Sequence, residues 1–370
     1  MSKIICITLG TRPEAIKLAP VIQAFLSQPD FDTKVILTGQ HREMVQQVMD
    51  LFNLSAHEDL DIMQPQQTLS DITCRSLKGL EEIFTRIKPQ FVIAQGDTTT
   101  AFSASLASFY QQIPFGHVEA GLRTNNIYNP FPEEANRRLI SQITQLHFAP
   151  TTLAVENLHQ SGVTGEIHLT GNTVIDALLS VAKQNPVCKV EGLNWQKYRV
   201  LLVTVHRREN WGQPLADIIK GLQSILAKFP DTAILLPLHR NPTVREPLQR
   251  AFANHDRVFL TEPLDYEQLV GAINSCFFLL TDSGGLQEEA PSLGKPVLVL
   301  RETTERPEAV TAGTAKLIGT NAGQIFIEAS NLLADKTQYQ DMAEAINPFG
   351  DGKASARIVS ITRNYLEGAG

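Results

Sequence analysis

The sequence predicts an α/β protein made of two Rossmann-like domains, each built on a doubly wound parallel sheet. Short apolar runs alternate with longer helical patterns from end to end, and such alternation is typical of parallel sheets that helices cover on both faces. The alternation occurs in two sets, separated by a stretch that lacks it. At 370 residues the chain is also long enough for two or three domains with separate cores.

The apolar runs predict the strands in order. In the first set they are Ile4–Leu9, Lys34–Thr38, Phe91–Gln95, Pro114–Val118, Leu146–Ala149 and Ile167–Leu169. In the second set they are Arg199–Val205, Thr232–Pro237, Val258–Leu260, Phe277–Thr281, Pro296–Leu300 and Ala315–Ile318. Residues 181–198 break this rhythm and carry Pro186 and Gly192, which favours an interdomain connection there. The predicted domains are residues 1–180 and 199–353, and residues 354–370 are expected to form an amphipathic helix that packs back onto the first domain.

Composition is typical of a soluble globular protein, with 19% charged and 43% apolar residues. The net charge is −7 and the cationic residues are scattered, so nucleic acid is not expected as a partner. No apolar segment reaches the roughly 18 residues of a membrane span, and no secretory cleavage pattern follows the N-terminus. The four cysteines lie far apart, which favours free buried thiols in a reducing cytoplasm over a disulfide or a metal site.

The most specific local pattern lies between residues 276 and 308. An apolar run ends at Asp282, the turn Ser283–Gly285 follows, and a helix-favouring segment then carries Glu289. Free N–H groups and the positive end of a helix dipole suit a phosphate, and Glu289 is placed to accept hydrogen bonds from sugar hydroxyls. The pattern indicates a nucleotide that carries a ribose. An ordinary βα turn with an acidic first helical turn is the alternative.

Chemically active side chains recur after other predicted strands, where ligands bind in doubly wound sheets. Gly10–Glu14 lacks the G-x-G-x-x-G fingerprint, which disfavours a nicotinamide cofactor. Arg12 is suited to phosphate, and Lys17 adds a second cation near the same strand end. A proline-initiated helix start with exposed charges is the other interpretation. His206 and His239 each end a strand of the second half beside arginine, where a histidine is either structural or functional.

Three carboxylates of the first half are candidates for acid/base chemistry. Asp97 follows a strand, where helix capping is the alternative role. Glu119 shares a face with His117 if the backbone stays extended, and burial there would raise its pKa. Glu133 is spaced i,i+4 from Arg137, either as a weak surface pair or as a catalytic carboxylate oriented by that arginine.

The carboxylates thus come from the first half and most anion-binding groups from the second. This division indicates acid/base chemistry on a nucleotide sugar held in one cleft between the domains, with no evident metal or redox cofactor.

Several long motifs extend this interpretation. The chain carries, in order, GTRPEAIKLAP, GQHREM, GDTTT, GHVEAGLRT, PEEANRR, TGNTVIDAL, HRREN, TDSGGLQEEAPSLGKPVLVLRETTERPEAVTAGT and NPFGDGKASARI. From Gly10 to about Ile358 it resembles the non-hydrolysing UDP-N-acetylglucosamine (UDP-GlcNAc) 2-epimerases of bacteria. The resemblance implies a GT-B-like architecture, a cytoplasmic homodimer without a cofactor, and interconversion of UDP-GlcNAc and UDP-N-acetylmannosamine (UDP-ManNAc) for surface polysaccharide synthesis. In this reaction UDP is eliminated to give 2-acetamidoglucal and then adds back.

The resemblance also assigns residues to roles. Substrate binding is implied for Arg12, Lys17, Asp97, Glu119, His206, Leu264, Leu269, Ser283, Gly284, Gly285, Glu289 and Arg306. The implied catalytic set is Asp97, Glu119 and Glu133, supported by Lys17, Arg137 and His206. A second, activating UDP-GlcNAc site is implied at Gln40, Glu134, Arg207 and His239, although Glu43 and Gln66 stand where the family has glutamine and arginine. A GT-B glycosyltransferase, a hydrolysing epimerase and a non-enzymatic UDP-sugar sensor are the alternative functions.

Overall fold

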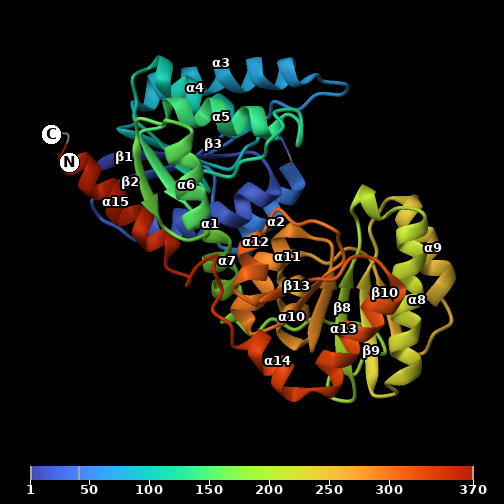
Figure 1. Ribbon diagram of the computed structural model, residues 1–370. Helices are drawn as coiled ribbons and strands as arrows, with labels where there is room; N and C mark the ends of the chain where they lie inside the picture. The colour runs from blue at the N-terminus through green and yellow to red at the C-terminus, as the bar shows by residue number, and fades with distance from the viewer. Residues whose placement is uncertain (1, 41, 369–370) are drawn as a thin grey trace. The chain divides into compact units, whose positions relative to one another are not determined.

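The computed structural model of the chain describes residues 2–40 and 42–368. The chain divides into two compact units, Met1–Ala177 with Phe349–Gly370 (unit 1) and Leu178–Pro348 (unit 2). Each unit contains one sheet with helices on its faces (Figure 1). Two separate α/β sheets confirm the predicted fold class.

Unit 1 contains a seven-stranded parallel sheet in the order β3-β2-β1-β4-β5-β6-β7. Its strands are β1 Lys3–Leu9, β2 Phe31–Leu37, β3 Glu58–Asp59, β4 Phe91–Gln95, β5 Phe115–Val118, β6 Leu146–Ala149 and β7 Glu166–Leu169. Its helices are α1 Arg12–Leu26, α2 Arg42–Leu51, α3 Leu69–Ile87, α4 Thr99–Tyr110, α5 Glu133–Ile143, α6 Thr152–Gln160 and α15 Ala354–Gly368, and α7 Thr173–Ala182 crosses the division between the units. The six predicted strands are confirmed, and only the two-residue β3 was not predicted.

Unit 2 contains a six-stranded parallel sheet in the order β10-β9-β8-β11-β12-β13. Its strands are β8 Arg199–Thr204, β9 Thr232–Pro237, β10 Val258–Thr261, β11 Phe278–Thr281, β12 Val297–Val299 and β13 Ala315–Leu317. Its helices are α8 Gln213–Lys228, α9 Pro242–Phe252, α10 Tyr266–Ser275, α11 Gly284–Glu289, α12 Pro307–Thr311, α13 Ala322–Ala334 and α14 Lys336–Ala343, with short 3-10 turns at Arg208–Asn210 and Ala290–Leu293. All six strands predicted for the second half are confirmed.

The strand order fixes where ligands can bind. In unit 1 the order reverses between β1 and β4, and in unit 2 it reverses between β8 and β11. The central strands are apolar and buried because helices cover both faces; every residue of β4 is buried. In open α/β sheets, ligands bind beyond the carboxyl ends of the strands at such a reversal. The loops after these four strands are therefore the positions at which a site is expected.

The C-terminal helix α15 packs in unit 1 against α1. Arg363 of α15 donates from Nε to Asp30 at 2.8 Å, and Tyr365 meets Phe91 edge to face with ring centroids 5.9 Å apart. The last two residues of the predicted segment 354–370 lie outside the described residues. Across residues 2–40 and 42–368, no helix is both long and apolar enough to cross a membrane. All four cysteines are free; Cys6, Cys188 and Cys276 are buried and Cys74 is exposed.

Candidate active site

The reversal in unit 1 is organised by a buried carboxylate that sequence analysis missed. Glu14, 1% exposed, accepts the backbone N–H groups of Gly10 at 2.9 Å and Thr11 at 2.7 Å, and also the hydroxyl of Thr98. Burial raises the pKa of the Glu14 carboxyl, against the lowering effect of these hydrogen bonds. Glu14 thereby ties the turn after β1 to the turn after β4. The T-x-x-E spacing of Thr11 and Glu14, which is the sequence pattern of a capping box, was the available signal.

Glu119 lies after β5, and its conformation differs from the expected one. The strand ends at Val118, and Glu119 has φ 62°, so the extended alternation that would place it on one face with His117 does not apply. Lys17 donates from Nζ to both Glu119 carboxylate oxygens at 2.6 Å. The side-chain amide of Gln95 donates to the same carboxylate. Glu119 thus combines a left-handed backbone conformation with a carboxylate that the ammonium group of Lys17 and the amide of Gln95 hold.

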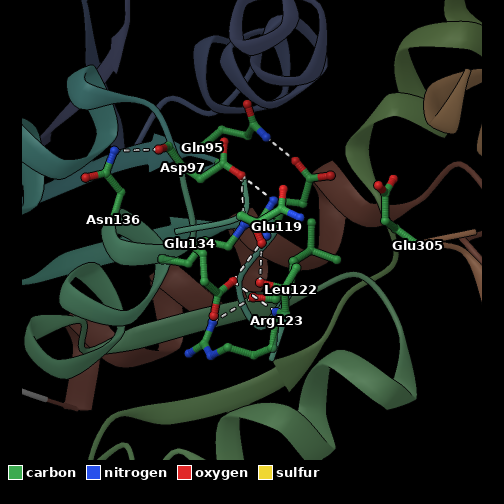
Figure 2. A network of polar contacts seen from close by, with 12 residues as sticks. Gln95, Asp97, Glu119, Leu122, Arg123, Glu134, Asn136 and Glu305 are labelled. Atoms are coloured by element: carbon green, nitrogen blue, oxygen red, sulfur yellow. Dashed lines mark hydrogen bonds and ion pairs between the residues drawn. The ribbon is translucent and has the colours of Figure 1, made fainter. Parts of the chain in front are cut away.

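Asp97 lies in a second network that spans two elements of unit 1 (Figure 2). Arg137 of α5 contacts Asp97 Oδ2 from Nε at 2.8 Å and from Nη2 at 2.7 Å, and it also donates from Nη1 to Glu134 at 3.3 Å. Asn136 donates from Nδ2 to the Asp97 backbone oxygen at 2.8 Å. The expected pairing of Arg137 with Glu133 was therefore wrong, because Arg137 points to Asp97 and Glu134 instead.

The remaining carboxylate, Glu133, is the first residue of α5. Its Oε2 atom is buried and has no hydrogen-bond partner within the described part of the chain. Arg12 is the first residue of α1, and no described residue forms a hydrogen bond or ion pair with its side chain. Gln40, after β2, receives a long hydrogen bond of 3.4 Å from Thr100 near the start of α4. These groups leave polar atoms available at the carboxyl edge of the sheet.

In unit 2, the residue after β11 is a fully buried aspartate that anchors the loop after β8. Asp282 accepts the backbone N–H groups of His206 and Arg207, each at 2.9 Å, and the side-chain amide of Asn210 at 3.0 Å. It also faces His206 Nδ1 at 2.8 Å. Burial pushes the pKa of Asp282 up, but the His206 contacts and the Arg207 N–H outweigh burial and hold it below its ordinary value. Asp282 therefore fixes one ring nitrogen of His206 and leaves Nε2 for a ligand.

Gly284 and Gly285 open α11 directly after this aspartate. A Cβ at Gly284 would lie 3.6 Å from Arg207 Nη2, and one at Gly285 would lie 3.7 Å from Glu289 Oε2. These are ordinary van der Waals distances, and neither glycine has a left-handed φ. Internal packing therefore does not require glycine at either position, and the absence of a Cβ leaves the backbone at the start of α11 open to close approach.

Unit 2 also contains a pocket of about 270 Å³ at the same edge of its sheet. It brings together five residues of the predicted binding set, namely His206, Leu264, Leu269, Ser283 and Glu289. Glu289 accepts the hydroxyl of Tyr266 at 3.0 Å. His239, which the resemblance assigns to a second site, lines this same pocket and stacks on His206 with ring centroids 6.2 Å apart. A lining of leucine and proline side chains together with a carboxylate suits a flat base and a sugar.

Two arginines of unit 2 that belong to the predicted sites are paired with carboxylates. Arg207 contacts Glu305 at 3.5 Å, and Arg306, at the N-cap of α12, pairs with Glu288. Across the part of the chain that the structure describes, no three His, Cys, Asp or Glu side chains form a group that would hold a metal ion. The polar groups described after β1, β4, β8 and β11 are carboxylates, cations, amides and a histidine.

Comparisons with known proteins agree with this arrangement. The UDP-N-acetylglucosamine 2-epimerase of Salmonella typhimurium is 50% identical to this chain over 96% of it and 97% of the relative. A crystal structure of a Listeria monocytogenes protein matches with a TM-score of 0.92 at 43% identity, covering 99% of this chain and 97% of the other. The enzyme from Neisseria meningitidis, solved bound to UDP-GlcNAc, matches with a TM-score of 0.87 at 45% identity, covering 98% and 100%.

These matches extend over nearly the whole chain and confirm the GT-B-like fold class. The family model described as UDP-N-acetylglucosamine 2-epimerase matches residues 23–363, which include most of both units, while Arg12, Glu14 and Lys17 lie before the matched range. The chain therefore belongs to the UDP-N-acetylglucosamine 2-epimerase family.

Proposed function

We propose that this protein interconverts UDP-GlcNAc and UDP-ManNAc without hydrolysis, by eliminating UDP and adding it back. The observation that carries the proposal is the environment of two carboxylates in unit 1. Glu119 is gripped by Lys17, and Asp97 is gripped by Arg137. Two carboxylates that are each fixed by a cation are suited to proton transfer at two faces of one carbon.

Unit 2 supplies the binding of UDP in this proposal. The uracil ring lies against Leu264 and Leu269, and a ribose hydroxyl donates to Glu289. The diphosphate meets the backbone at Gly284 and Gly285, where the geometry leaves room for it. His206 Nε2 and Arg306 add donors to the phosphate oxygens, and we assign the same role to Arg12 of unit 1.

The chemistry of the sugar explains why elimination is required. The proton at C2 has no adjacent carbonyl to acidify it, so direct abstraction and return would be slow. When the C1–O bond breaks, its electron pair leaves with UDP while a carboxylate takes the C2 proton, and 2-acetamidoglucal forms. A UDP oxygen then attacks C1 as C2 is protonated from the opposite face, which re-forms the C1–O bond and gives the UDP sugar with C2 inverted. The developing charge on UDP needs the donors described above.

Glu133 differs from the other two carboxylates. Its buried Oε2 atom lacks a partner among the described residues, whereas Asp97 and Glu119 each face a cation. An unpartnered carboxylate oxygen is suited to accept a hydrogen bond from a substrate hydroxyl. We therefore place Glu133 as the third member of the catalytic set, beside the pair that serves C2.

Proton NMR of UDP-GlcNAc incubated with the protein in D₂O tests the proposal. We expect an equilibrium mixture of two UDP sugars with deuterium at C2. Free N-acetylmannosamine with UDP would instead identify a hydrolysing epimerase, and unchanged UDP-GlcNAc despite UDP binding would identify a sensor. Replacing Asp97 by Asn or Glu119 by Gln should lower turnover at least about a hundredfold, the usual range for acid/base groups, while UDP still binds.

The wider role follows from the same resemblance. We infer that the enzyme works in the cytoplasm as a homodimer and that UDP-ManNAc feeds surface polysaccharide synthesis. Light scattering during size-exclusion chromatography tests the dimer. Loss of N-acetylmannosamine-derived sugar from the surface polymer of a deletion strain tests the pathway.

A further inference from the structure

Glu134 lies at the centre of an arginine network at the start of α5 (Figure 2). Its side chain is 0% exposed. Oε1 accepts Nε of Arg138 at 2.8 Å, and Oε2 accepts the backbone N–H of Thr124 at 3.0 Å and Nη1 of Arg137 at 3.3 Å. Both carboxylate oxygens are therefore engaged by protein donors, and a ligand could reach neither without first breaking this network.

The network continues from Glu134 to Asp97 through a single side chain. Arg137 uses Nη1 for Glu134 and directs Nε and Nη2 to Asp97 Oδ2. A guanidinium group is planar and rigid, so fixing one of its edges fixes the direction of the other. Because Arg137 holds only Oδ2, the plane of the Asp97 carboxylate and the direction of its Oδ1 atom depend on where Glu134 holds the guanidinium group.

The charges lead to the same conclusion. Arg137 is flanked by two carboxylates, Glu134 on one side and Asp97 on the other. Without the charge of Glu134, Arg137 would lose one of its two anchors and would be free to change rotamer. Asn136 would still hold the Asp97 backbone, through its 2.8 Å contact with the carbonyl oxygen, but not the Asp97 side chain.

We propose that Glu134 is a positioning residue that orients the catalytic carboxylate of Asp97 through Arg137, rather than a contact for a second substrate molecule. The inference rests on the proposed epimerase function. It predicts a specific kinetic result, because Glu134 acts on the reacting carboxylate and touches neither UDP nor the sugar.

The test is the Glu134→Gln variant, which keeps the shape of the side chain and removes its charge. We expect kcat to fall about 10- to 100-fold, the cost of a small misplacement of a reacting group, with KM and the Kd for UDP unchanged within about twofold. In an Asp97→Asn background the same substitution should have no further effect, because the positioned group is already lost. Unchanged kcat, or an equal loss in both backgrounds, would overturn the proposal. So would a variant that loses only a cooperative dependence on UDP-GlcNAc concentration.

Asp176→Asn is the matched control for neutralising a buried acid. Asp176 accepts the backbone N–H groups of Ala354 and Ser355 and so joins α7 to α15. This variant should lower the Tm but leave kcat within about twofold. If Glu134→Gln does not fold, Arg137→Lys replaces it, because a lysine cannot hold both carboxylates in the same way and should lower kcat similarly.

A crystal structure of Glu134→Gln separates this inference from the proposed function. We expect the Arg137–Asp97 contact to be lost or Asp97 to adopt two rotamers, whether or not the wild type is active. An unchanged Asp97 and Arg137 geometry would refute the positioning role. An inactive wild type would refute the epimerase proposal alone.

Discussion

Two histidines buried in the sheet of unit 1 should make this protein lose stability in mild acid. His117 of β5 and His147 of β6 are register partners on neighbouring strands, 1% and 0% exposed. Neither ring nitrogen of His147 has a hydrogen-bond partner among the described residues. Burial is the largest effect on both rings and lowers the pKa of His117 to about 4 and that of His147 to about 3.

The sign and size of the effect follow from these shifts. Each folded-state pKa lies below the ordinary value of 6.5, so the unfolded chain takes up protons first as the pH falls. The stability that each neutral ring contributes is complete above pH 6.5 and is lost on the way down to the folded-state pKa. At pH 5, about 1.5 units below that ordinary value, the loss is about 2 kcal/mol for each histidine at about 1.4 kcal/mol per unit.

The assay is urea unfolding at pH 8 and pH 5, with His147→Leu compared with the wild type by far-UV circular dichroism. We expect the leucine variant to be at least as stable at pH 8, because it removes two unpaired nitrogens from the core. The difference in the free energy of unfolding between the leucine variant and the wild type should grow by about 2 kcal/mol at pH 5, in favour of the variant. Glu14 and Asp176, whose pKa values burial raises, contribute stability that is lost as the pH rises, but both proteins share this effect.

Both tryptophans provide an internal control, because Trp195 and Trp211 lie in unit 2. The unfolding transition seen by tryptophan fluorescence should therefore be the same in the variant and the wild type if each unit unfolds separately. If the circular dichroism difference between the two proteins is the same at pH 8 and pH 5, the reasoning is refuted. His147 would then titrate as an ordinary solvated histidine.

Three further predictions concern the site. Gly284→Ala and Gly285→Ala should fold normally, because the added methyl group meets only ordinary contacts, but should weaken UDP binding by about tenfold or more in calorimetry by blocking the helix backbone. Tyr266→Phe should reduce the preference for UDP over 2′-deoxy-UDP, because it removes the hydroxyl that orients Glu289. An unchanged ratio of the two Kd values would count against ribose recognition by Glu289. Lys17→Met should lower kcat at least about a hundredfold in the NMR assay, because it leaves the Glu119 carboxylate without its ammonium partner. Near-normal turnover would remove Lys17 from the catalytic set.

The strands were predictable because burial on both faces of a parallel sheet demands continuous apolar runs. The exception is instructive. β3, Glu58–Asp59, contains two acidic residues and no apolar run, and it counts as a strand only through its backbone pairing with Ile36 and Leu37 of β2. A strand defined by backbone pairing at the edge of a sheet leaves no hydrophobic pattern in the sequence.

The location of the site was predictable from topology, but the partners of its side chains were not. The i,i+4 spacing predicted that Arg137 pairs with Glu133, yet Arg137 is only 15% exposed and contacts Asp97, 40 residues away in sequence. Asp282 and His206 are 76 residues apart. Helical spacing describes neighbours on one exposed surface, whereas a buried side chain chooses among all the elements packed around it. Strand alternation also could not predict the left-handed backbone conformation of Glu119.

The buried polar atoms without partners show how stability and function can be separated in this fold. His147 lies within β6, between paired strands, so no substrate can reach its ring nitrogens, and their desolvation is only a cost. Glu133 bears the same kind of cost at Oε2, but it begins the helix that also carries Asn136 and Arg137, the two residues that hold Asp97. In the proposed function a substrate hydroxyl donates to this atom, so substrate binding would offset its desolvation cost. The position of an unpaired atom at the carboxyl edge of the sheet, rather than its burial alone, distinguishes a ligand contact from a packing defect.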